Sequence, residues 1–258
     1  MQTNYRGVVF FDLDNTLLDE HSQITTEVAT AMQQLKQNQF LPVINTGRAP
    51  REILDIRQAT GIDTFISLNG SYLEHDHQAL YKSQIDTQLI TAVVELANQL
   101  NDGVSFYTTS EIRTLKSDAN VNDAYNLIHT PIPEVDPNFY QDQEILMLLL
   151  LNKDHDQAYF DKFPQFTYYR NSPYSIDTVL AGNSKMNGIK QLLQQLELTN
   201  VPTYGFGDGP NDLSMLEFVD HPVAMGNGIP EAKAAAEFVT TANTDHGIVN
   251  GLKHFNLI

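Results

Sequence analysis

The sequence predicts an α/β fold: a Rossmann-like, doubly wound parallel sheet, with an α+β cap domain inserted into it. Strand-like and helix-like segments alternate through Gly70, and the alternation returns after residue 183. This order is typical of parallel sheets with right-handed crossovers. Between the two parts, several strand-like segments follow one another, as in an α+β domain.

Three strand-like segments alternate with two helix-like ones before the insertion. Residues 8–11 are all apolar, as expected for a strand that is buried on both faces of a parallel sheet. Apolar residues then recur at near-helical spacing. The expected strands are residues 8–11, 40–44 and 65–68, and the expected helices are residues 24–40 and 51–60.

The segment after residue 183 predicts three more strands, each preceded by a helix or followed by one. Ser184 is suited to cap the first helix, and Pro230 suits the first turn of the last one. The expected helices are residues 186–196, 211–219 and 229–236, and the expected strands are residues 201–206, 222–225 and 238–241.

The middle of the chain is expected to form the inserted cap. We assign residues 1–82 and 183–258 to the core domain and residues 83–182 to the α+β cap. Within the cap, the patterns predict helices at residues 85–100 and 157–163, and strands at residues 104–109, 112–116, 144–152, 166–170 and 175–180.

Composition and charge exclude several classes of protein. The 258 residues are 41% hydrophobic, without cysteine, and no apolar run approaches the roughly 18 residues that cross a bilayer. The first residues lack the organisation of a signal peptide, so a cytoplasmic location is expected. The net charge of −17 disfavours binding to nucleic acid and to anionic membranes. An anionic substrate would therefore need local positive charge at its site.

The first candidate motif is Asp12-Leu13-Asp14-Asn15-Thr16, directly after the apolar run. Ligands bind at the carboxyl ends of strands in α/β sheets, so two acids there indicate a site. One carboxylate can attack phosphorus, and a second can exchange protons with the leaving oxygen and with water. A helix-capping or calcium-binding pair of acids is the alternative.

Two further motifs could hold an anion. Thr46-Gly47-Arg48 follows the strand at residues 40–44, where a hydroxyl group and backbone N–H groups can bind phosphate oxygens. Lys185 lies at the expected start of a helix, where a cation opposes the helix dipole unless an anion is nearby. A routine helix cap and a solvated surface lysine are the alternatives.

The fourth motif runs from Gly207 to Asp212 and contains two acids four residues apart, Asp208 and Asp212. Magnesium prefers one or two carboxylates together with water and substrate phosphate, so this turn suits Mg²⁺. Its glycine spacing does not match a dinucleotide-binding loop. All four motifs fall where strands end or helices begin, so one phosphoryl-transfer site could collect them.

The four motifs, in this order, resemble those of the haloacid dehalogenase-like (HAD) superfamily. More narrowly, the chain is similar to the Cof-type phosphatases, whose α+β cap, of type IIB, lies between the second and third motifs. Three further stretches fit the same branch: Asn69-Gly70, residues 223–233 and Asp245-His246-Gly247.

The resemblance implies roles for the acids. Asp12 would be the nucleophile and a metal ligand. Asp14 would be the general acid and base, and its main-chain carbonyl would also bind the metal. Asp208 would ligate Mg²⁺, and Asp212 would support the metal site from the second layer. Having Asp14 favours a phosphatase over a dehalogenase.

The resemblance also implies a phosphate-binding set: Thr46, Gly47, Lys185 and Asn211. Asn15 stands where glycine is commoner, and asparagine tolerates a positive φ better than most residues. Arg48 and Arg51 could contact substrate anions, but ion pairing on a helix surface is the preferred interpretation. His75 and His77 could bind a metal, but a solvated turn is the preferred interpretation.

The resulting hypothesis is an Mg²⁺-dependent phosphatase that hydrolyses a small phosphorylated metabolite, such as a sugar phosphate, through an aspartyl-phosphate intermediate. A phosphomutase of sugar phosphates is the first alternative. A non-catalytic protein that binds phosphometabolites is the second. The sequence predicts neither the substrate, nor the cap residues that contact it, nor the oligomeric state.

Overall fold

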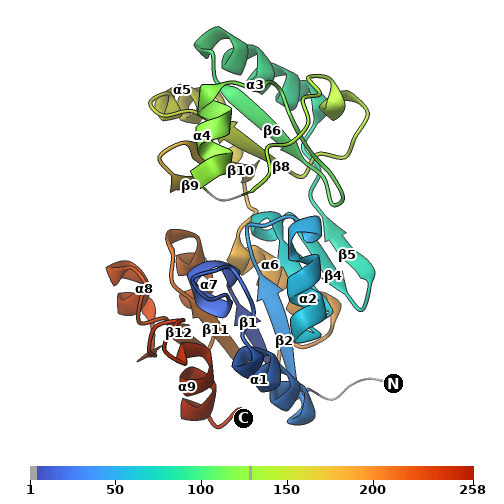
Figure 1. Cartoon of the computed structure of the whole chain (residues 1–258). Helices are drawn as coiled ribbons and strands as arrows, with labels where there is room; N and C mark the ends of the chain where they lie inside the picture. Colours follow the sequence, from blue (N-terminus) through green and yellow to red (C-terminus); the bar gives the residue numbers. More distant parts are fainter. Residues whose placement is uncertain (1–4, 128–129) are drawn as a thin grey trace. The chain divides into compact units, whose positions relative to one another are not determined.

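The computed structural model describes residues 5–127 and 130–258, and these form two compact units. Unit 1 contains residues 5–48, Glu52–Tyr81 and Ser184–Ile258. Unit 2 contains Ala49–Arg51 and the described part of Lys82–Asn183. The units therefore change at Tyr81/Lys82 and Asn183/Ser184, where the sequence suggested 82/83 and 182/183. In Figure 1 the two ends of the chain, blue and red, build unit 1 together.

Unit 1 contains an eight-stranded sheet in the order β13-β12-β11-β1-β2-β3-β4-β5. The six strands from β13 to β3 are parallel. The strands are β1 (Gly7–Phe11), β2 (Phe40–Asn45), β3 (Thr64–Ser67), β4 (Tyr72–His75), β5 (Gln78–Lys82), β11 (Thr203–Gly207), β12 (His221–Ala224) and β13 (Phe238–Val239). This is the predicted fold class, and its central strand β1 precedes the first acidic motif.

The last two strands at one side of the sheet, β4 and the edge strand β5, were not predicted. Strand β4 pairs antiparallel with β3, with Thr64 opposite His75. The connection to β5 places Asp76 and His77 at φ 46° and 63°. Two successive positive φ values define the tight hairpin turn that Asn-Gly usually forms. Asp-His gives no such signal, so the hairpin was missed.

Helices cover both faces of this sheet, as a doubly wound fold requires (Figure 1). On one face, α6 and α7 pack with Val8, Phe10 and Val43 in one hydrophobic cluster. Helix α1 contacts β2, α2 and α9. The helices of unit 1 are α1 (Thr26–Gln37), α2 (Leu54–Thr60), α6 (Lys185–Gln195), α7 (Leu213–Leu216), α8 (Pro230–Ala235) and α9 (Gly247–His254).

Unit 2 is an α+β unit with a five-stranded sheet in the order β7-β6-β8-β10-β9. Every neighbouring pair is antiparallel, and a separate hydrophobic cluster, which includes Phe106 and Tyr159, fills the unit. The strands are β6 (Gly103–Tyr107), β7 (Ile112–Thr114), β8 (Met147–Leu151), β9 (Phe166–Ser172) and β10 (Ser175–Leu180). The helices are α3 (Thr87–Leu100), α4 (Ala119–Leu127) and α5 (Asp156–Lys162).

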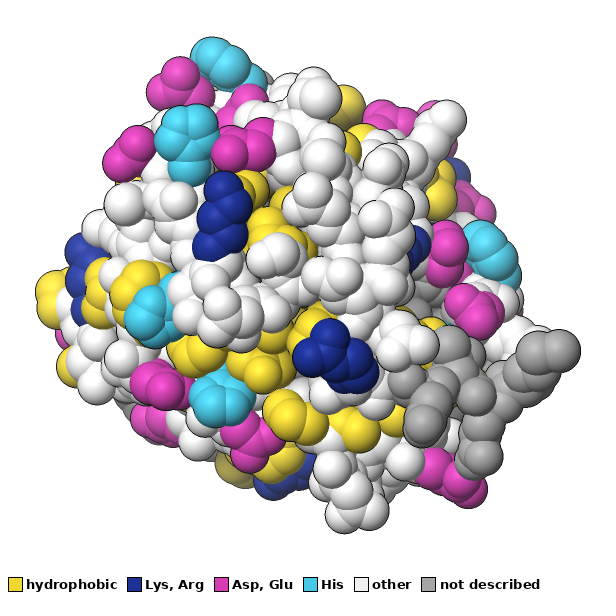
Figure 2. All heavy atoms as spheres, turned by 90° about the horizontal axis from the view of Figure 1, so that it is seen from below, with side chains coloured by type: hydrophobic (Ala, Val, Ile, Leu, Met, Phe, Trp, Pro, Cys, Tyr) yellow, Lys and Arg dark blue, Asp and Glu magenta, His cyan; other side chains and the backbone are white. Residues whose placement is uncertain are grey.

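The surface fits the acidic composition. On the face drawn in Figure 2, most Asp and Glu side chains lie toward the edge, and the few Lys and Arg side chains lie both near the edge and nearer the middle. Within residues 5–127 and 130–258, every helix is too short or too polar to cross a membrane.

Candidate active site

Asp12 continues directly from the buried strand β1, and its side chain is almost fully enclosed at 9% exposure. Its N–H donates to the carbonyl of Phe206 on β11, so the residue is still held in the sheet. Burial, together with the charge of Asp212, raises the pKa of Asp12 well above its usual value. The carboxylate therefore lies in a place that disfavours negative charge unless cations are close.

The chain turns sharply after Asp12, through Leu13–Leu17. Asn15 adopts φ 59°, the left-handed conformation that its side chain tolerates. The turn brings the hydroxyl of Thr16 to Asp208, where it donates to Oδ1 at 2.8 Å. The turn that follows strand β1 is thereby joined to the turn that follows strand β11.

Asp14 lies on the outside of this turn, with half of its side chain exposed. Arg48 donates to both carboxylate oxygens: Nε to Oδ2 at 3.0 Å, and Nη2 to Oδ1. This pairing corrects the interpretation of Arg48 as a residue that pairs on a helix surface. The guanidinium group instead holds the carboxylate that was predicted to move protons.

Thr46 follows β2 and is buried, whereas Gly47 is half-buried. The hydroxyl of Thr46 accepts a hydrogen bond from the N–H of Arg48 at 3.1 Å. The Thr46 carbonyl accepts from the N–H of Asn69 at 3.1 Å. The turn at Leu68–Gly70 therefore supports the loop that was predicted to bind phosphate.

Lys185 begins helix α6 with a fully buried side chain. Its Nζ donates to Asp12 Oδ1 and, at 2.6 Å, to Asp212 Oδ1. Burial disfavours the charged form, but the carboxylates of Asp12 and Asp212 outweigh it and raise the pKa of Lys185. Lys185 is therefore a permanent cation between two acids, and not the solvated surface lysine of the alternative interpretation.

Gly70 allows this helix to start so close to the sheet. Its φ is +90°, and a Cβ atom there would lie 2.3 Å from the carbonyl oxygen of Ser184. Ser184 caps α6, because its side chain accepts from the N–H of Asn187. Glycine at position 70 thus permits the close approach that carries Lys185 to Asp12.

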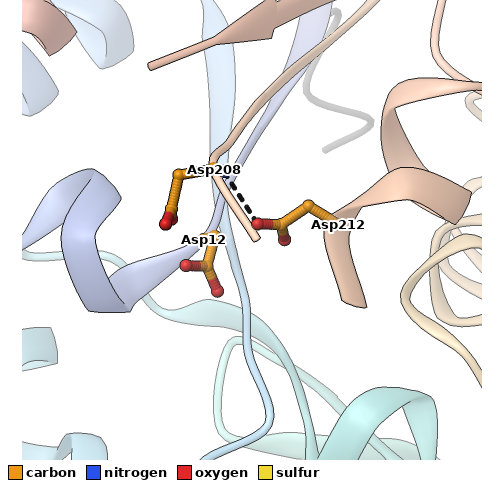
Figure 3. Close-up of side chains that lie close together, drawn as sticks. All are labelled: Asp12, Asp208 and Asp212. Carbon is orange, nitrogen blue, oxygen red and sulfur yellow. Dashed lines mark hydrogen bonds between the residues drawn. The ribbon is translucent and has the colours of Figure 1, made fainter. Parts of the chain in front are cut away.

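Asp208 and Asp212 come from the turn between β11 and α7. Oδ2 of Asp212 accepts from the N–H groups of Asp208 and Gly209, each at 2.9 Å. Figure 3 shows the first of these bonds and the three acids facing one another. Burial, followed by the charge of Asp212, raises the pKa of Asp208 to about 6. Asn211, half-buried in the same turn, donates to Oδ1 of Asn69 at 3.3 Å.

The acids fit a divalent cation. One oxygen from each of Asp12, Asp208 and Asp212 lies within 4.8 Å of the others. Lys185 is the cation bonded to two of these acids. Hard carboxylate oxygens suit Mg²⁺. Both oxygens of Asp212 already accept hydrogen bonds, which leaves Asp12 and Asp208 as the freer ligands.

The site unites most of the predicted residues at one edge of the sheet. Lys185 donates hydrogen bonds to both Asp12 and Asp212, and the backbone N–H of Asp208 donates to Asp212. Thr46 and Asn211 are linked through Asn69. Sequence analysis gave no role to Thr16, although its place in the first motif was a usable signal, and it did not foresee the contact of Arg48 with Asp14.

A Rossmann-like sheet that gathers acids, a buried lysine and a threonine loop at one edge is characteristic of phosphoryl-transfer enzymes. The sequence profile of the haloacid dehalogenase-like hydrolases matches residues 9–252. The chain belongs to this family, which confirms the resemblance noted in its sequence.

Relatives and solved structures agree with this assignment. The chain is 32% identical to Bacillus subtilis (strain 168) "Putative phosphatase YkrA" over 252 residues, which cover 97% of this chain and 98% of YkrA. A crystal structure of a hypothetical protein from Geobacillus kaustophilus HTA426 has a TM-score of 0.91 and 35% identity, covering 97% and 99% of the two chains. The HAD subclass IIB sugar phosphatase BT4131 has a TM-score of 0.86 and 26% identity, covering 97% and 99%. The chain is thus a HAD-type phosphatase.

Proposed function

We propose that this enzyme is an Mg²⁺-dependent phosphatase that hydrolyses a small phosphorylated metabolite through a phosphoryl group carried on Asp12. The observation that carries the proposal is the buried Asp12 carboxylate, bonded to Lys185 and lying within 4.8 Å of Asp208 and Asp212. Asp14, two residues further, provides a second carboxylate that water can reach.

In the first half-reaction, a carboxylate oxygen of Asp12 attacks the phosphorus atom. The bond from phosphorus to the ester oxygen breaks, and that oxygen takes a proton from Asp14. Lys185, Thr46, Gly47 and Asn211 bind the phosphoryl oxygens. Because Lys185 stays charged, it offsets the negative charge that develops at the phosphoryl group as the bond to Asp12 forms and the bond to the ester oxygen breaks.

In the second half-reaction, Asp14 takes a proton from a water molecule whose oxygen attacks phosphorus. The bond to Asp12 breaks, and the products are inorganic phosphate and the free Asp12 carboxylate. Mg²⁺, when bound by Asp12, Asp208 and the main-chain carbonyl of Asp14, supplies charge neutralisation for the phosphoryl group. Asp212 supports this arrangement through Lys185 and the backbone of Asp208.

The relatives suggest which substrates to examine. BT4131 is described as a sugar phosphatase. Bacillus subtilis YitU, 25% identical over 261 residues, is named 5-amino-6-(5-phospho-D-ribitylamino)uracil phosphatase. We propose a phosphomonoester of this small, polar kind as substrate and assign its selection to unit 2. A turnover screen over phosphorylated sugars and sugar alcohols would measure this preference.

The decisive test is Asp12→Asn. The variant should lose turnover of phosphomonoesters by at least about 10⁴-fold, since it lacks the nucleophilic carboxylate. It should keep the fold, because asparagine has nearly the same size and shape as aspartate. Addition of EDTA to the native enzyme should abolish phosphate release, and Mg²⁺ should restore it. Mg²⁺-dependent activity retained in Asp12→Asn would overturn the mechanism. An isomerised sugar phosphate in place of free phosphate would indicate a mutase.

A further inference from the structure

The loop Met225–Ile229, which follows strand β12, reaches the turn that carries Asp12 and Asp14. Asn227, exposed at the tip of this loop, donates from Nδ2 to the carbonyl oxygen of Asn15 at 2.8 Å. The two residues are 212 positions apart in the sequence. The side-chain amide of Asn227 therefore holds a catalytic turn from a distant part of the chain.

A second asparagine completes the arrangement. The backbone N–H of Asn243 donates to Oδ1 of Asn227 at 2.9 Å, which fixes which end of the Asn227 amide faces the turn. The side chain of Asn243 donates from Nδ2 to the carbonyl of Leu18 at 2.8 Å. We call Asn227 and Asn243 the asparagine clamp, because one side-chain amide binds a carbonyl within the turn and the other binds the carbonyl of Leu18 directly after it.

The same loop also lies against Asp208. A Cβ atom on Gly228 would lie 3.1 Å from the Cα atom of Asp208, so the loop packs tightly against the Asp208 backbone. The N–H of Ile229 donates to the Asp208 carbonyl at 2.9 Å. One short loop thus contacts the backbone beside both carboxylate-bearing segments of the metal site.

The turn at Asn15 receives support from outside, in addition to the tolerance of asparagine for a positive φ. A left-handed residue outside glycine costs free energy, and it persists when surrounding structure fixes it. Asn15 has φ 59° and ψ 10°, and its side of the turn is exposed to water. The hydrogen bond from Asn227 to the Asn15 carbonyl supplies support at this residue. The peptide that joins Asp14 to Asn15 carries the carbonyl that the proposed function assigns to the metal.

We propose that Asn227 is a positioning residue for the metal site and that Asn243 orients it. The inference rests on the proposed function, because it concerns the metal that this function requires. The clamp fixes the Asn15 peptide, and with it the direction of the neighbouring Asp14 carbonyl relative to Asp208. Groups that orient metal ligands typically alter metal affinity or activity by about 10- to 100-fold.

The test compares Asn227→Ala with Asn38→Ala. Asn38 also donates from its side-chain amide to a backbone carbonyl, that of Leu257, at 2.8 Å. It lies just before β2, at the amino ends of the parallel strands, whereas the candidate site lies at their carboxyl ends. Binding of Mn²⁺ alone would be measured by electron paramagnetic resonance, and unfolding of the metal-free proteins by thermal denaturation. We expect Asn227→Ala to bind Mn²⁺ about tenfold more weakly, with substrate KM at saturating Mg²⁺ changed less than twofold.

Asn243→Ala keeps the backbone bond to Asn227 and loses only the bond to Leu18, so its Mn²⁺ affinity should fall less than that of Asn227→Ala. Asn243→Ala also provides a second test of the inference if Asn227→Ala does not fold. Mn²⁺ binding within twofold of the native value in both clamp variants would overturn the inference, as would an equal loss in Asn38→Ala. Phosphate release by the native enzyme that is unaffected by EDTA would instead overturn the proposed function. Failure of the inference and failure of the proposed function can therefore be told apart.

Discussion

Asp14 and Arg48 form an ion pair at the turn that directly follows Asp12, the proposed nucleophile. Arg48→Ala should lower kcat about tenfold, because the guanidinium group sets the position of the carboxylate that we propose transfers protons. The pair is partly exposed, so the free energy of unfolding should change by less than about 1 kcal/mol. Steady-state kinetics and urea denaturation measure the two effects.

A double-mutant cycle separates this role from direct contact of Arg48 with substrate. If Arg48 acts through Asp14, then Arg48→Ala should have no further effect on kcat in an Asp14→Asn background. Arg48→Lys should rescue only part of the loss, because lysine lacks the fork that contacts both oxygens. Additive effects of the two substitutions would mean that Arg48 works independently of Asp14.

If Asp208 ligates Mg²⁺ as proposed, the metal affinity of the site should depend on pH. Its pKa is raised to about 6, chiefly by burial and then by the charge of Asp212. Below that pH the Asp208 carboxyl group is protonated in the folded protein, so binding of Mg²⁺ at the proposed site should release the proton. Affinity should therefore be constant above about pH 7 and fall by about tenfold per pH unit below pH 6.

Isothermal titration of Mg²⁺ into the protein between pH 5 and pH 8, in buffers with different ionisation enthalpies, would measure both affinity and proton release. Asp208→Asn should lose the metal affinity and the released proton together. An affinity that stays unchanged from pH 7 to pH 5 would contradict the assignment of Asp208 as a ligand.

At the scale of elements, the start of helix α6 depends on Gly70. Gly70→Ala should destabilise the metal-free protein by about 3 kcal/mol, from the positive φ and from contact with the carbonyl of Ser184. The displaced helix would move Lys185, so inhibition by inorganic phosphate should weaken as well. Chemical denaturation and product-inhibition assays measure the two effects.

Gly61→Ala is the matched control, since Gly61 also has a positive φ, +67°, but the nearest atom to its added Cβ would be 3.5 Å away. It should cost only the backbone strain, about 1–2 kcal/mol, with phosphate inhibition unchanged. If Gly70→Ala and Gly61→Ala lost the same free energy of unfolding and the same phosphate inhibition, the close approach of Gly70 to Ser184 would have no influence on Lys185.

The elements that hold the site were predictable because they have strong local patterns. The buried apolar run Val8–Phe11 allows only a central strand, and the strand ends then place Asp12 and Asp208 near each other. Helices α4 and α9 were missed, since the first is rich in asparagine and the second contains two glycines, which weakens any helical signal. The expected helix at 211–219 is shorter, a single 3₁₀ turn followed by Leu213–Leu216.

Contacts between distant parts of the chain were beyond prediction from the sequence. Arg48 and Asp14 are 34 residues apart, and Asn227 and Asn15 are 212 apart. Their residue types and local spacing are those of ordinary surface polar residues. Only the strand order makes these pairs possible: β2, which precedes Arg48, lies beside β1, and β12, which precedes Asn227, lies on the other side of β1 with β11 between them.

At the scale of the whole molecule, the insertion begins and ends at one place. The side chain of Asn183 donates to the hydroxyl of Ser83 at 2.8 Å, so the two ends of unit 2 are adjacent. Units 1 and 2 have separate hydrophobic clusters. Domains of this kind, with neighbouring termini and a core of their own, can fold alone. We therefore expect a fragment of residues 82–183 to unfold cooperatively.

The complementary protein, in which a short Gly-Ser linker replaces residues 82–183, should keep Mn²⁺ binding within about threefold of the native value, because the acids, Lys185 and the asparagine clamp all belong to unit 1. Turnover of the preferred metabolite should fall much further than turnover of a small aryl phosphate, since we assign substrate selection to unit 2. Thermal denaturation of both fragments, Mn²⁺ titration and parallel kinetics measure this. Loss of metal binding in a folded unit 1 would show that the insertion helps to shape the metal site itself.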